Sequence, residues 1–205
     1  MTAGLRRVVV ATRNRGKLRE ILRLLEPAGL AFDLVTIDDV APGAALIEDE
    51  LTFEGNALAK ARQAAAATGL PALADDSGLE VDALGGAPGV WSARYAGEPS
   101  DDGRNNVKLV EAMASVPAGA RGARFRCVAA FVDPARGIEI ARAGACDGEI
   151  LREPRGDGGF GYDPLFLLPS KGRTMAELDL DAKNGVSHRA AAFRALAREI
   201  AAGVG

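Results

Sequence analysis

Short apolar runs alternate along the chain with longer stretches of helical periodicity. Residues 5–12, which contain the apolar run from Val8 to Ala11, predict a buried strand. The next apolar positions recur with the spacing of one helix face, i, i+3, i+4 and i+7: Leu18, Ile21, Leu22 and Leu25. We expect Asn14 to cap this helix and Pro27 to end it.

The same alternation continues to the end of the sequence and predicts an α/β fold. Further strands are predicted at residues 30–37, 71–74, 79–84 and 164–168, and helices at 52–68, at 104–115 and after a cap at Ser187. Residues 123–132 and 137–146 read as a hairpin around Asp133-Pro134, and residues 38–51, 85–97 and 156–163 as loops. With no repeat or linker, residues 1–205 are expected to form one domain.

Composition excludes several classes of protein. Of the 205 residues, 48% are hydrophobic and 26% charged, as in ordinary globular proteins. No apolar run approaches the roughly 18 residues of a membrane helix, so no membrane partner is expected. Two arginines before the first apolar run imitate a leader peptide, but charge returns directly after Ala11. We therefore interpret that run as a strand and expect a cytoplasmic protein.

The charged and reactive residues narrow the chemistry further. A net charge of −3 does not suit a nucleic-acid binder, so any anionic ligand must be held by local basic groups. Cys127 and Cys146 have neither disulfide-framework nor zinc spacing. The single histidine, His188, excludes multi-histidine metal sites and, without a paired nucleophile, argues against a Ser-His-Asp triad.

The junction between the first strand and the first helix is a candidate phosphate site. Its residues are Thr12, Arg13, Asn14, Arg15, Gly16 and Lys17. A helix N-terminus binds anions through its free N–H groups and its dipole, and Lys17 lies in the first turn. The segment is not a P-loop, since Ala11 and Leu18 stand where that motif needs Gly and Ser or Thr. A capped helix with a surface lysine is the alternative.

Two further segments carry candidate functional side chains. Asn56 and Lys60 are four residues apart and share one helix face. Asp75 and Asp76 follow an apolar run, so we expect them at a strand end with their side chains on opposite faces. Acidic groups without histidine suit Mg²⁺, for which Glu48 is a candidate third carboxylate. The alternatives are a snorkelling lysine and an Asx turn.

The loop at residues 156–163 matches G-x-G-x-x-G, but a proline and a strand follow where a dinucleotide-binding site needs a helix. What remains is a loop whose aromatic and acidic side chains could stack on a base and read its edge, or simply fill the core. Near the C-terminus, Ser187 is expected to cap the last helix and to place His188 and Arg189 in its first turn. There Arg189 could recognise a base carbonyl.

Six ordered motifs in this sequence resemble those of the inosine/xanthosine triphosphate pyrophosphatases. They are Thr12-x-Asn14-x-x-Lys17, Phe53-Glu54-x-Asn56-Ala57-x-x-Lys60-Ala61, Ala74-Asp75-Asp76-Ser77-Gly78-Leu79, Gly85-Gly86-x-Pro88-Gly89-x-x-Ser92-Ala93-Arg94-Tyr95, Gly159-Phe160-Gly161-Tyr162-Asp163-Pro164 and Ser187-His188-Arg189. The resemblance extends from about Val8 to Leu196. One departure is Gly55, where glutamate is more usual.

This resemblance implies a fold, a reaction and a set of partners. The fold would be one elongated α/β domain of two lobes around a long mixed sheet, with the active-site cleft between the lobes. The enzyme would be a homodimer that uses Mg²⁺ to hydrolyse ITP, dITP and XTP to the monophosphate and pyrophosphate. Such activity keeps noncanonical purine nucleotides out of DNA and RNA.

The resemblance also implies roles for individual residues. Residues 12–17 and Lys60 would bind the triphosphate, and Ser77 would touch the substrate. Glu48 and Asp76 would hold Mg²⁺, with Asp76 also the general base, although Asp49, Glu50 and Asp75 stay open as ligands. The base would be enclosed and read by Phe160, Gly161, Tyr162, Asp163, Lys183, His188 and Arg189.

Three other interpretations stay open on the sequence alone. A related pyrophosphatase could act on modified pyrimidine nucleotides. A binding protein without activity would share the fold but lack the paired carboxylates, which this chain has at Asp75 and Asp76. Trp91 and Tyr95 could bind substrate, although in a Gly-rich segment they are expected to pack in the core or at a dimer interface.

Overall fold

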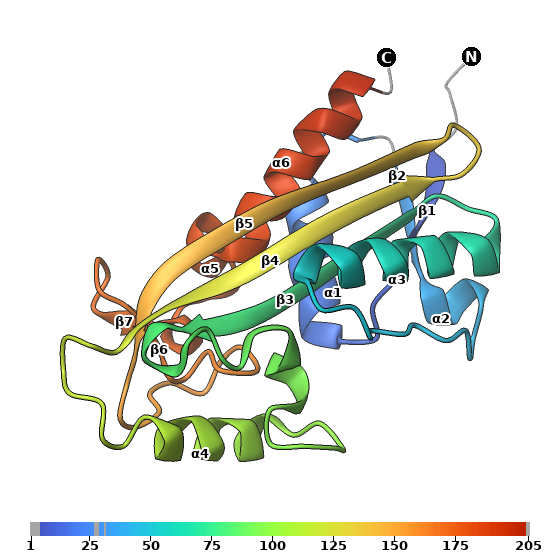
Figure 1. The fold of residues 1–205 in the computed structure, drawn as a ribbon. Coiled ribbons are helices and arrows are strands. Elements are labelled where there is room, and N and C mark those ends of the chain that lie inside the picture. The colour runs from blue at the N-terminus through green and yellow to red at the C-terminus, as the bar shows by residue number, and fades with distance from the viewer. Residues whose placement is uncertain (1–4, 27–28, 31, 204–205) are drawn as a thin grey trace. The chain divides into compact units, whose positions relative to one another are not determined.

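The computed structural model describes residues 5–26, 29–30 and 32–203 (Figure 1). Its helices and strands are mixed along the chain, as the sequence predicts, although β4 to β7 follow one another with no helix between them. The strands are β1 Arg6–Val10, β2 Phe32–Thr36, β3 Ala72–Val81, β4 Gly122–Asp133, β5 Ile138–Ile150, β6 Phe166–Leu168 and β7 Arg173–Thr174. The α-helices are α1 Arg15–Leu25, α2 Ile37–Val40, α3 Phe53–Thr68, α4 Asp102–Ala112, α5 Leu180–Val186 and α6 His188–Gly203. The 3-10 turns are η2 Asp82–Leu84, η3 Gly89–Arg94 and η4 Met175–Glu177.

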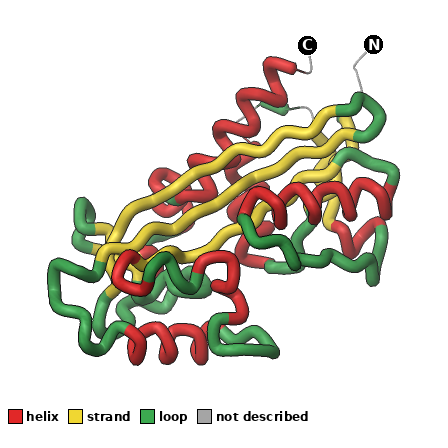
Figure 2. The backbone as a smooth tube through the Cα atoms, viewed as in Figure 1, coloured by secondary structure: helices red, strands yellow, loops and turns green. Residues whose placement is uncertain are grey.

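The strands form one seven-stranded mixed sheet in the order β2-β1-β3-β4-β5-β6-β7 (Figure 2). Strand β1 pairs in parallel with both β2 and β3, whereas β5-β6 and β6-β7 are antiparallel. The predicted α/β class is therefore confirmed. Among the described residues, no helix is long and apolar enough to cross a membrane.

The chain divides into two compact units, which we describe separately. Unit 1 comprises residues 1–76, 127–144 and 189–205, and unit 2 comprises residues 77–126 and 145–188. The boundary falls within β3, between Asp76 and Ser77, and at the start of α6, between His188 and Arg189. Strands β3, β4 and β5 each contribute residues to both units.

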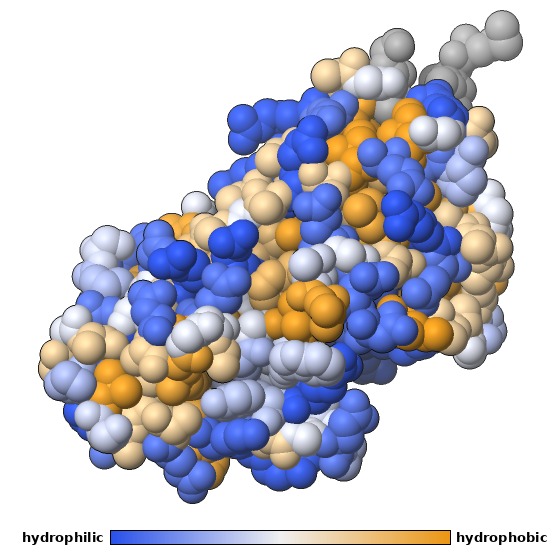
Figure 3. Space-filling view, viewed as in Figure 1, coloured by the Kyte–Doolittle hydropathy of each residue, from blue (hydrophilic) through white to orange (hydrophobic). Residues whose placement is uncertain are grey.

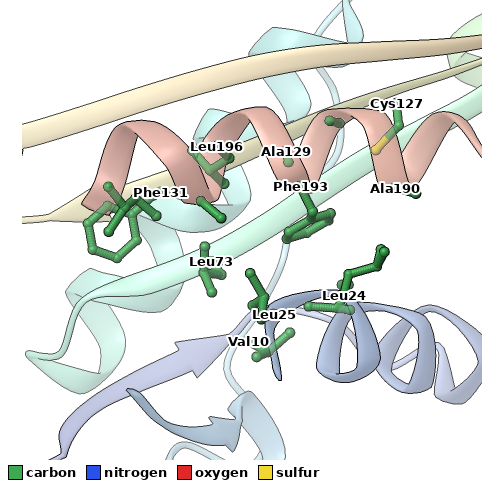
Figure 4. Close-up of a cluster of buried hydrophobic side chains, with 14 of the residues drawn as sticks. Val10, Leu24, Leu25, Leu73, Cys127, Ala129, Phe131, Ala190, Phe193 and Leu196 are labelled. Atoms are coloured by element: carbon green, nitrogen blue, oxygen red, sulfur yellow. The ribbon is translucent and has the colours of Figure 1, made fainter. Parts of the chain in front are cut away.

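In unit 1, helices α1 and α6 cover one face of the sheet (Figure 4). The buried cluster on that face takes alternate residues of each strand, as the two-residue period of a strand requires. It includes Val8, Val10, Leu73, Cys127, Ala129, Phe131, Ala190, Phe193 and Leu196. The α3 helix presents its buried small residues Ala57, Ala61, Ala64 and Ala65, which permit close packing.

The predicted cap at Asn14 is present, and the structure shows a second cap at Thr52. Asn14 caps α1 by accepting from the N–H of Lys17, and Thr52 caps α3 by accepting from the N–H of Gly55. Gly69 ends α3 in the left-handed conformation, at φ 69°. The predicted stop at Pro27 lies outside the described residues. A Cβ at Gly55 would come within 2.9 Å of the Glu50 side chain, so the missing Cβ makes room for the 48–52 segment.

Three predictions about local structure are wrong. Residues 72–81 form a single strand, so Asp75 and Asp76 lie within β3 and not at a strand end; each is buried beside cations, which makes its burial tolerable. The 38–51 segment begins in the short helix α2, because Thr36 and Asp39 form a capping box. The predicted stripe on α1 is rotated: Leu22 is exposed, and Glu20 and Leu24 are buried.

In unit 2, a second apolar cluster packs around Phe125, Phe166, Tyr162 and Leu109. The sequence analysis missed α5, which places Lys183 on a short helix capped by Asp179. Tyr95 packs at the edge of this cluster, and the Trp91 side chain stays about half exposed beneath the Arg94 guanidinium. Hydrophilic residues dominate the face in Figure 3, broken by small hydrophobic patches.

Candidate active site

The two adjacent aspartates of β3 organise the charged side chains of unit 1. Because neighbouring strand residues point to opposite faces, Asp75 and Asp76 meet different helices, as predicted. Asp75 faces α1 and α6, where it contacts Lys17 and Arg189. Asp76 faces α3, where it contacts Asn56 and Lys60. Both aspartates are buried, at 1% and 6% exposure.

The Asp75 face carries a buried network of balanced charge. The Lys17 Nζ atom lies 3.4 Å from Asp75 Oδ2, and Arg189 donates to the same oxygen from Nε and Nη2, each at 3.1 Å. Arg189 also donates from Nη1 to Glu20. Burial would lower the pKa of Arg189, but these two carboxylates raise it overall, so the guanidinium stays charged.

The Asp76 face carries an excess of negative charge. The Lys60 ammonium contacts Glu48 and lies 3.6 Å from Asp76 Oδ1, so two carboxylates share one cation. Asn56 donates from Nδ2 to Asp76 Oδ2 at 3.1 Å. Burial raises the pKa of Asp76, although Lys60 and Lys17 oppose that shift. Burial would lower the pKa of Lys60, but Asp76 and Glu48 raise it overall.

Glu48, Asp49 and Glu50, whose carboxylates the sequence left open as metal ligands, lie in three different environments. Glu48 reaches Lys60, whereas Asp49 is exposed. Glu50 is held through its backbone: its N–H donates to Asn56 Oδ1 at 3.0 Å, and its carbonyl accepts from Asn56 Nδ2 at 3.3 Å. The structure therefore brings Glu48 beside Asp76. Among the described residues, no group of three acidic, histidine or cysteine side chains forms a metal cluster.

The predicted phosphate-binding segment, residues 12–17, connects β1 to α1 and includes the first turn of that helix. Thr12 accepts from the N–H of Asn14, and Arg13 donates to Asp38 at 2.9 Å and to the Ala44 carbonyl at 2.7 Å. Arg13 therefore ties the loop after α2 to this junction. Arg15 is exposed, and Lys17 keeps 17% of its side chain exposed. Gly16, in the first turn, is half-buried.

The predicted base-recognition residues 160–163 lie on a loop of unit 2. Side-chain contacts fix this loop in place. Asp163 is buried, accepts from the N–H of Phe160 at 2.9 Å, and pairs with Lys183 at 2.6 Å. The Lys183 ammonium also lies 4.6 Å from the centre of the Phe160 ring. The structure thus brings together Phe160, Asp163 and Lys183, three of the residues that the resemblance assigns to the base.

The other residues predicted to contact the substrate lie in different environments. The Tyr162 ring is buried and its hydroxyl donates to the Ser92 carbonyl at 2.8 Å, so this aromatic fills the core. His188 is buried and stacks on Phe125, with ring centres 4.8 Å apart. Ser77 is half-buried within β3. The structure places Arg189 in unit 1, where its guanidinium engages Asp75 and Glu20.

Sequence reasoning missed Glu20 and gave Asn56 no role of its own. The signal for Glu20 was its position four residues before Leu24, which places it in the buried stripe of α1. The signal for Asn56 was its spacing from Lys60, because side chains four apart on α3 meet the same strand residue.

Comparisons with known proteins find the same family throughout. A family model described as the Ham1 family matches residues 8–199. The chain is 56% identical over 190 residues to the dITP/XTP pyrophosphatase of Geobacter sulfurreducens, covering 93% of this chain and 94% of that protein. It is 49% identical over 193 residues to the dITP/XTP pyrophosphatase of Escherichia coli K12, covering 94% and 96%.

Solved structures give the same result for the fold. A HAM1 protein from Coxiella burnetii superposes with a TM-score of 0.85 at 42% identity, covering 96% of this chain and 98% of the other. The Ham1 protein of Staphylococcus aureus also reaches 0.85, at 36% identity, covering 97% and 100%.

Proposed function

The chain belongs to the Ham1 family, and from that premise we propose that it is a nucleoside triphosphate pyrophosphatase acting on noncanonical purine nucleotides. Its substrates would be ITP, dITP and XTP, and its products the monophosphate and pyrophosphate. The observation that carries the proposal is the Lys60 ammonium shared by Glu48 and Asp76, with Lys17 and Asp75 on the other face of the strand. Cations for a polyphosphate thus stand beside a buried carboxylate that can accept a proton.

We assign the proton-accepting role to Asp76. A water attacks the α-phosphorus and gives its proton to the Asp76 carboxylate, a new P–O bond forms, and the bond to the bridging oxygen of pyrophosphate breaks. A raised pKa favours this role, because a base works best when its pKa approaches the working pH. Asn56 holds the other carboxylate oxygen of Asp76 and so fixes its orientation.

Enzymes of this family are in general metal-dependent, and for this chain we propose Mg²⁺. The residues fit that ion: Asp76 and Glu48 offer only oxygen ligands, and two carboxylates beside one ammonium leave an excess negative charge. Mg²⁺ is typically held by one or two carboxylates together with waters and substrate phosphates. When bound, it would neutralise charge on the phosphates and the leaving group.

The polyphosphate would be bound by basic side chains of unit 1. Lys17, Lys60 and the N-terminus of α1 would attract the triphosphate. Asn14 already caps the N–H of Lys17, so the remaining first-turn N–H groups are the ones that a phosphate would use.

The base would be received by the Phe160, Asp163 and Lys183 cluster of unit 2. A site that accepts a 6-oxo group and an N1–H would reject adenine, whose 6-amino group leaves donors facing donors.

We also propose that the chain forms a homodimer and acts in the cytoplasm, where its nucleotide substrates would be formed. The exposed Trp91 side chain beneath Arg94 supports the dimer, because tryptophan and arginine are enriched at interface hot spots. Light scattering should give twice the chain mass for the wild type and a smaller mass for Trp91→Ala. A monomeric wild-type protein would contradict this proposal.

Product analysis with Asp76→Asn tests the proposed reaction. The wild type should release one pyrophosphate and one IMP per ITP consumed, and Asp76→Asn should lose about 10²- to 10⁴-fold in kcat. Asp49→Asn is the matched control, because Asp49 is an exposed carboxylate in the 48–50 segment and should keep full activity. Release of orthophosphate, or an active Asp76→Asn enzyme, would contradict the proposal.

A further inference from the structure

Two side chains of helix α4 form hydrogen bonds with the backbone of Gly161, in the loop at residues 160–163 that is proposed to receive the base. The Gly161 N–H donates to Asp102 Oδ2 at 2.7 Å, and the Gly161 carbonyl accepts from Asn106 Nδ2 at 2.9 Å. Asp102 and Asn106 are four residues apart, so both project from the same face of α4. One helix face thus holds both peptide groups of a single loop residue.

Among residues 160–163, Gly161 is the one whose own side chain cannot hold it. It has no side chain and a positive φ of 60°, so its backbone is the least restricted of these four residues. The residues on either side are held by other means: Tyr162 through its buried ring and its bond to Ser92, and Phe160 through the contact of its N–H with Asp163. Without these two bonds, the Gly161 carbonyl would lose its bond to Asn106, and the peptide that joins Phe160 to Gly161 would be held only by the bond from the Asp163 N–H to the Phe160 carbonyl, so the Phe160 ring would be less firmly oriented.

Asn106 is retained at a cost that helix packing does not explain. Within the described residues, its Oδ1 atom is buried and has no hydrogen-bond partner. Burying an unsatisfied amide oxygen is unfavourable, and an apolar side chain would fill the same space without that penalty. What an apolar side chain would lack is the N–H donor that meets the Gly161 carbonyl.

We propose that Asp102 and Asn106 are positioning residues for base recognition. By fixing both peptide groups of Gly161, they set the orientation of the Phe160 ring beneath Lys183 and so the discrimination between bases. The inference rests on the proposed function, in which residues 160–163 receive the base. It adds to that site two side chains of α4 that act through the backbone of Gly161.

Kinetics with paired variants test this inference. Asn106→Ala and Asp102→Ala should each raise KM for ITP about tenfold and leave kcat within about twofold, because the proton-accepting groups of unit 1 are untouched. The preference for ITP over ATP should fall by a similar factor. Asp102→Asn keeps an oxygen that can accept from Gly161 and should restore most of the preference. Glu111→Ala, exposed on the last turn of α4, is the matched control and should behave as the wild type.

Amide exchange supplies a readout that does not depend on activity. The Gly161 N–H should be protected from hydrogen exchange in the wild type and in Glu111→Ala, and should exchange at least tenfold faster in Asp102→Ala. Thermal unfolding monitors whether each variant is folded at the assay temperature.

The outcomes separate the two claims. If the wild type prefers ITP and folded Asn106→Ala and Asp102→Ala keep the wild-type KM and preference, the positioning role is refuted and the proposed function stands. Equal loss of kcat toward every nucleotide would also refute it, as would a Gly161 amide that exchanges freely in the wild type. If the wild type does not hydrolyse ITP, the proposed function itself fails, and the inference fails with it.

Discussion

Replacing Arg189 by methionine removes a fully buried guanidinium from beside two buried carboxylates, Asp75 and Glu20. Methionine fills a similar volume but carries no charge, so the change isolates the electrostatic contribution. Lys17 lies 3.4 Å from Asp75 and compensates part of its charge. Loss of the guanidinium should therefore affect Glu20 more than Asp75.

Removing one partner of a buried ion pair costs about 3–5 kcal/mol, because the other charge stays buried without compensation. A loss of this size is a large fraction of the roughly 5–15 kcal/mol that stabilises a typical domain. We therefore expect Arg189→Met to lower the free energy of unfolding by about 3–5 kcal/mol near neutral pH. Adding Glu20→Gln to that variant should recover part of the loss, because it removes one of the two buried carboxylates that have lost the Arg189 guanidinium.

Urea unfolding measures these differences directly. Arg198→Met is the matched control: the same substitution in the same helix, at an exposed arginine, should change the free energy of unfolding by less than about 0.5 kcal/mol. If Arg189→Met destabilised the protein no more than Arg198→Met, the buried network around Asp75 would not have the energetic role that its geometry indicates. If Glu20→Gln added a further full loss instead of a recovery, the pairing with Glu20 would be refuted.

Three further predictions concern single contacts. In the metal-free protein the Asp76 carboxyl should titrate above the ordinary aspartate value of 3.8, because burial raises its pKa; an NMR titration with a midpoint below 3.8 would contradict this. Gly159→Ala should cost at least ~1–2 kcal/mol in thermal unfolding, since Gly159 has a φ of 74° and a Cβ would overlap Asp163; unchanged stability would count against the loop geometry. Tyr162→Phe should cost about 1–3 kcal/mol by leaving the Ser92 carbonyl buried and unpaired, and a cost near zero in urea unfolding would show that this bond is unimportant.

The sequence predicted most elements of the fold because their signals are local. The apolar spacing and the Asn14 cap placed α1, and the helix predicted at residues 52–68 agrees with α3 to within one residue. Strand β3 was predicted as two pieces because Asp75 and Asp76 look like a strand end. Their burial is tolerated only because Lys60, Lys17 and Arg189 approach from other parts of the chain, and this is tertiary information.

The candidate site was predicted in its residue types more completely than in its contacts. The resemblance named Lys60, Asp76, Asp163 and Lys183 as site residues, but it did not predict that Lys60 pairs with Asp76 or that Lys183 pairs with Asp163. The hydrogen bonds from α4 to Gly161 could not be predicted from the sequence. They join residues 55 or more positions apart through backbone groups, which carry no sequence signal.

Trp91 shows a different limit of sequence reasoning. The pattern predicted either core or interface, and the structure leaves this side chain 48% exposed, so the core alternative is wrong for Trp91. Exposure depends on how η3 turns its side chains, which the Gly-rich sequence around it does not specify.

Pyrophosphate release with Mg²⁺ from ITP, XTP, GTP, ATP and dTTP, measured in parallel, tests the central claim most directly. The account predicts strong preference for ITP and XTP, with pyrophosphate and the monophosphate formed in equal amounts. Equal turnover of ATP and ITP would contradict the proposed base recognition. Preference for a pyrimidine would keep the chemistry of Asp76 and overturn the assigned substrate, and folded protein that releases pyrophosphate from none of the five would contradict the account as a whole.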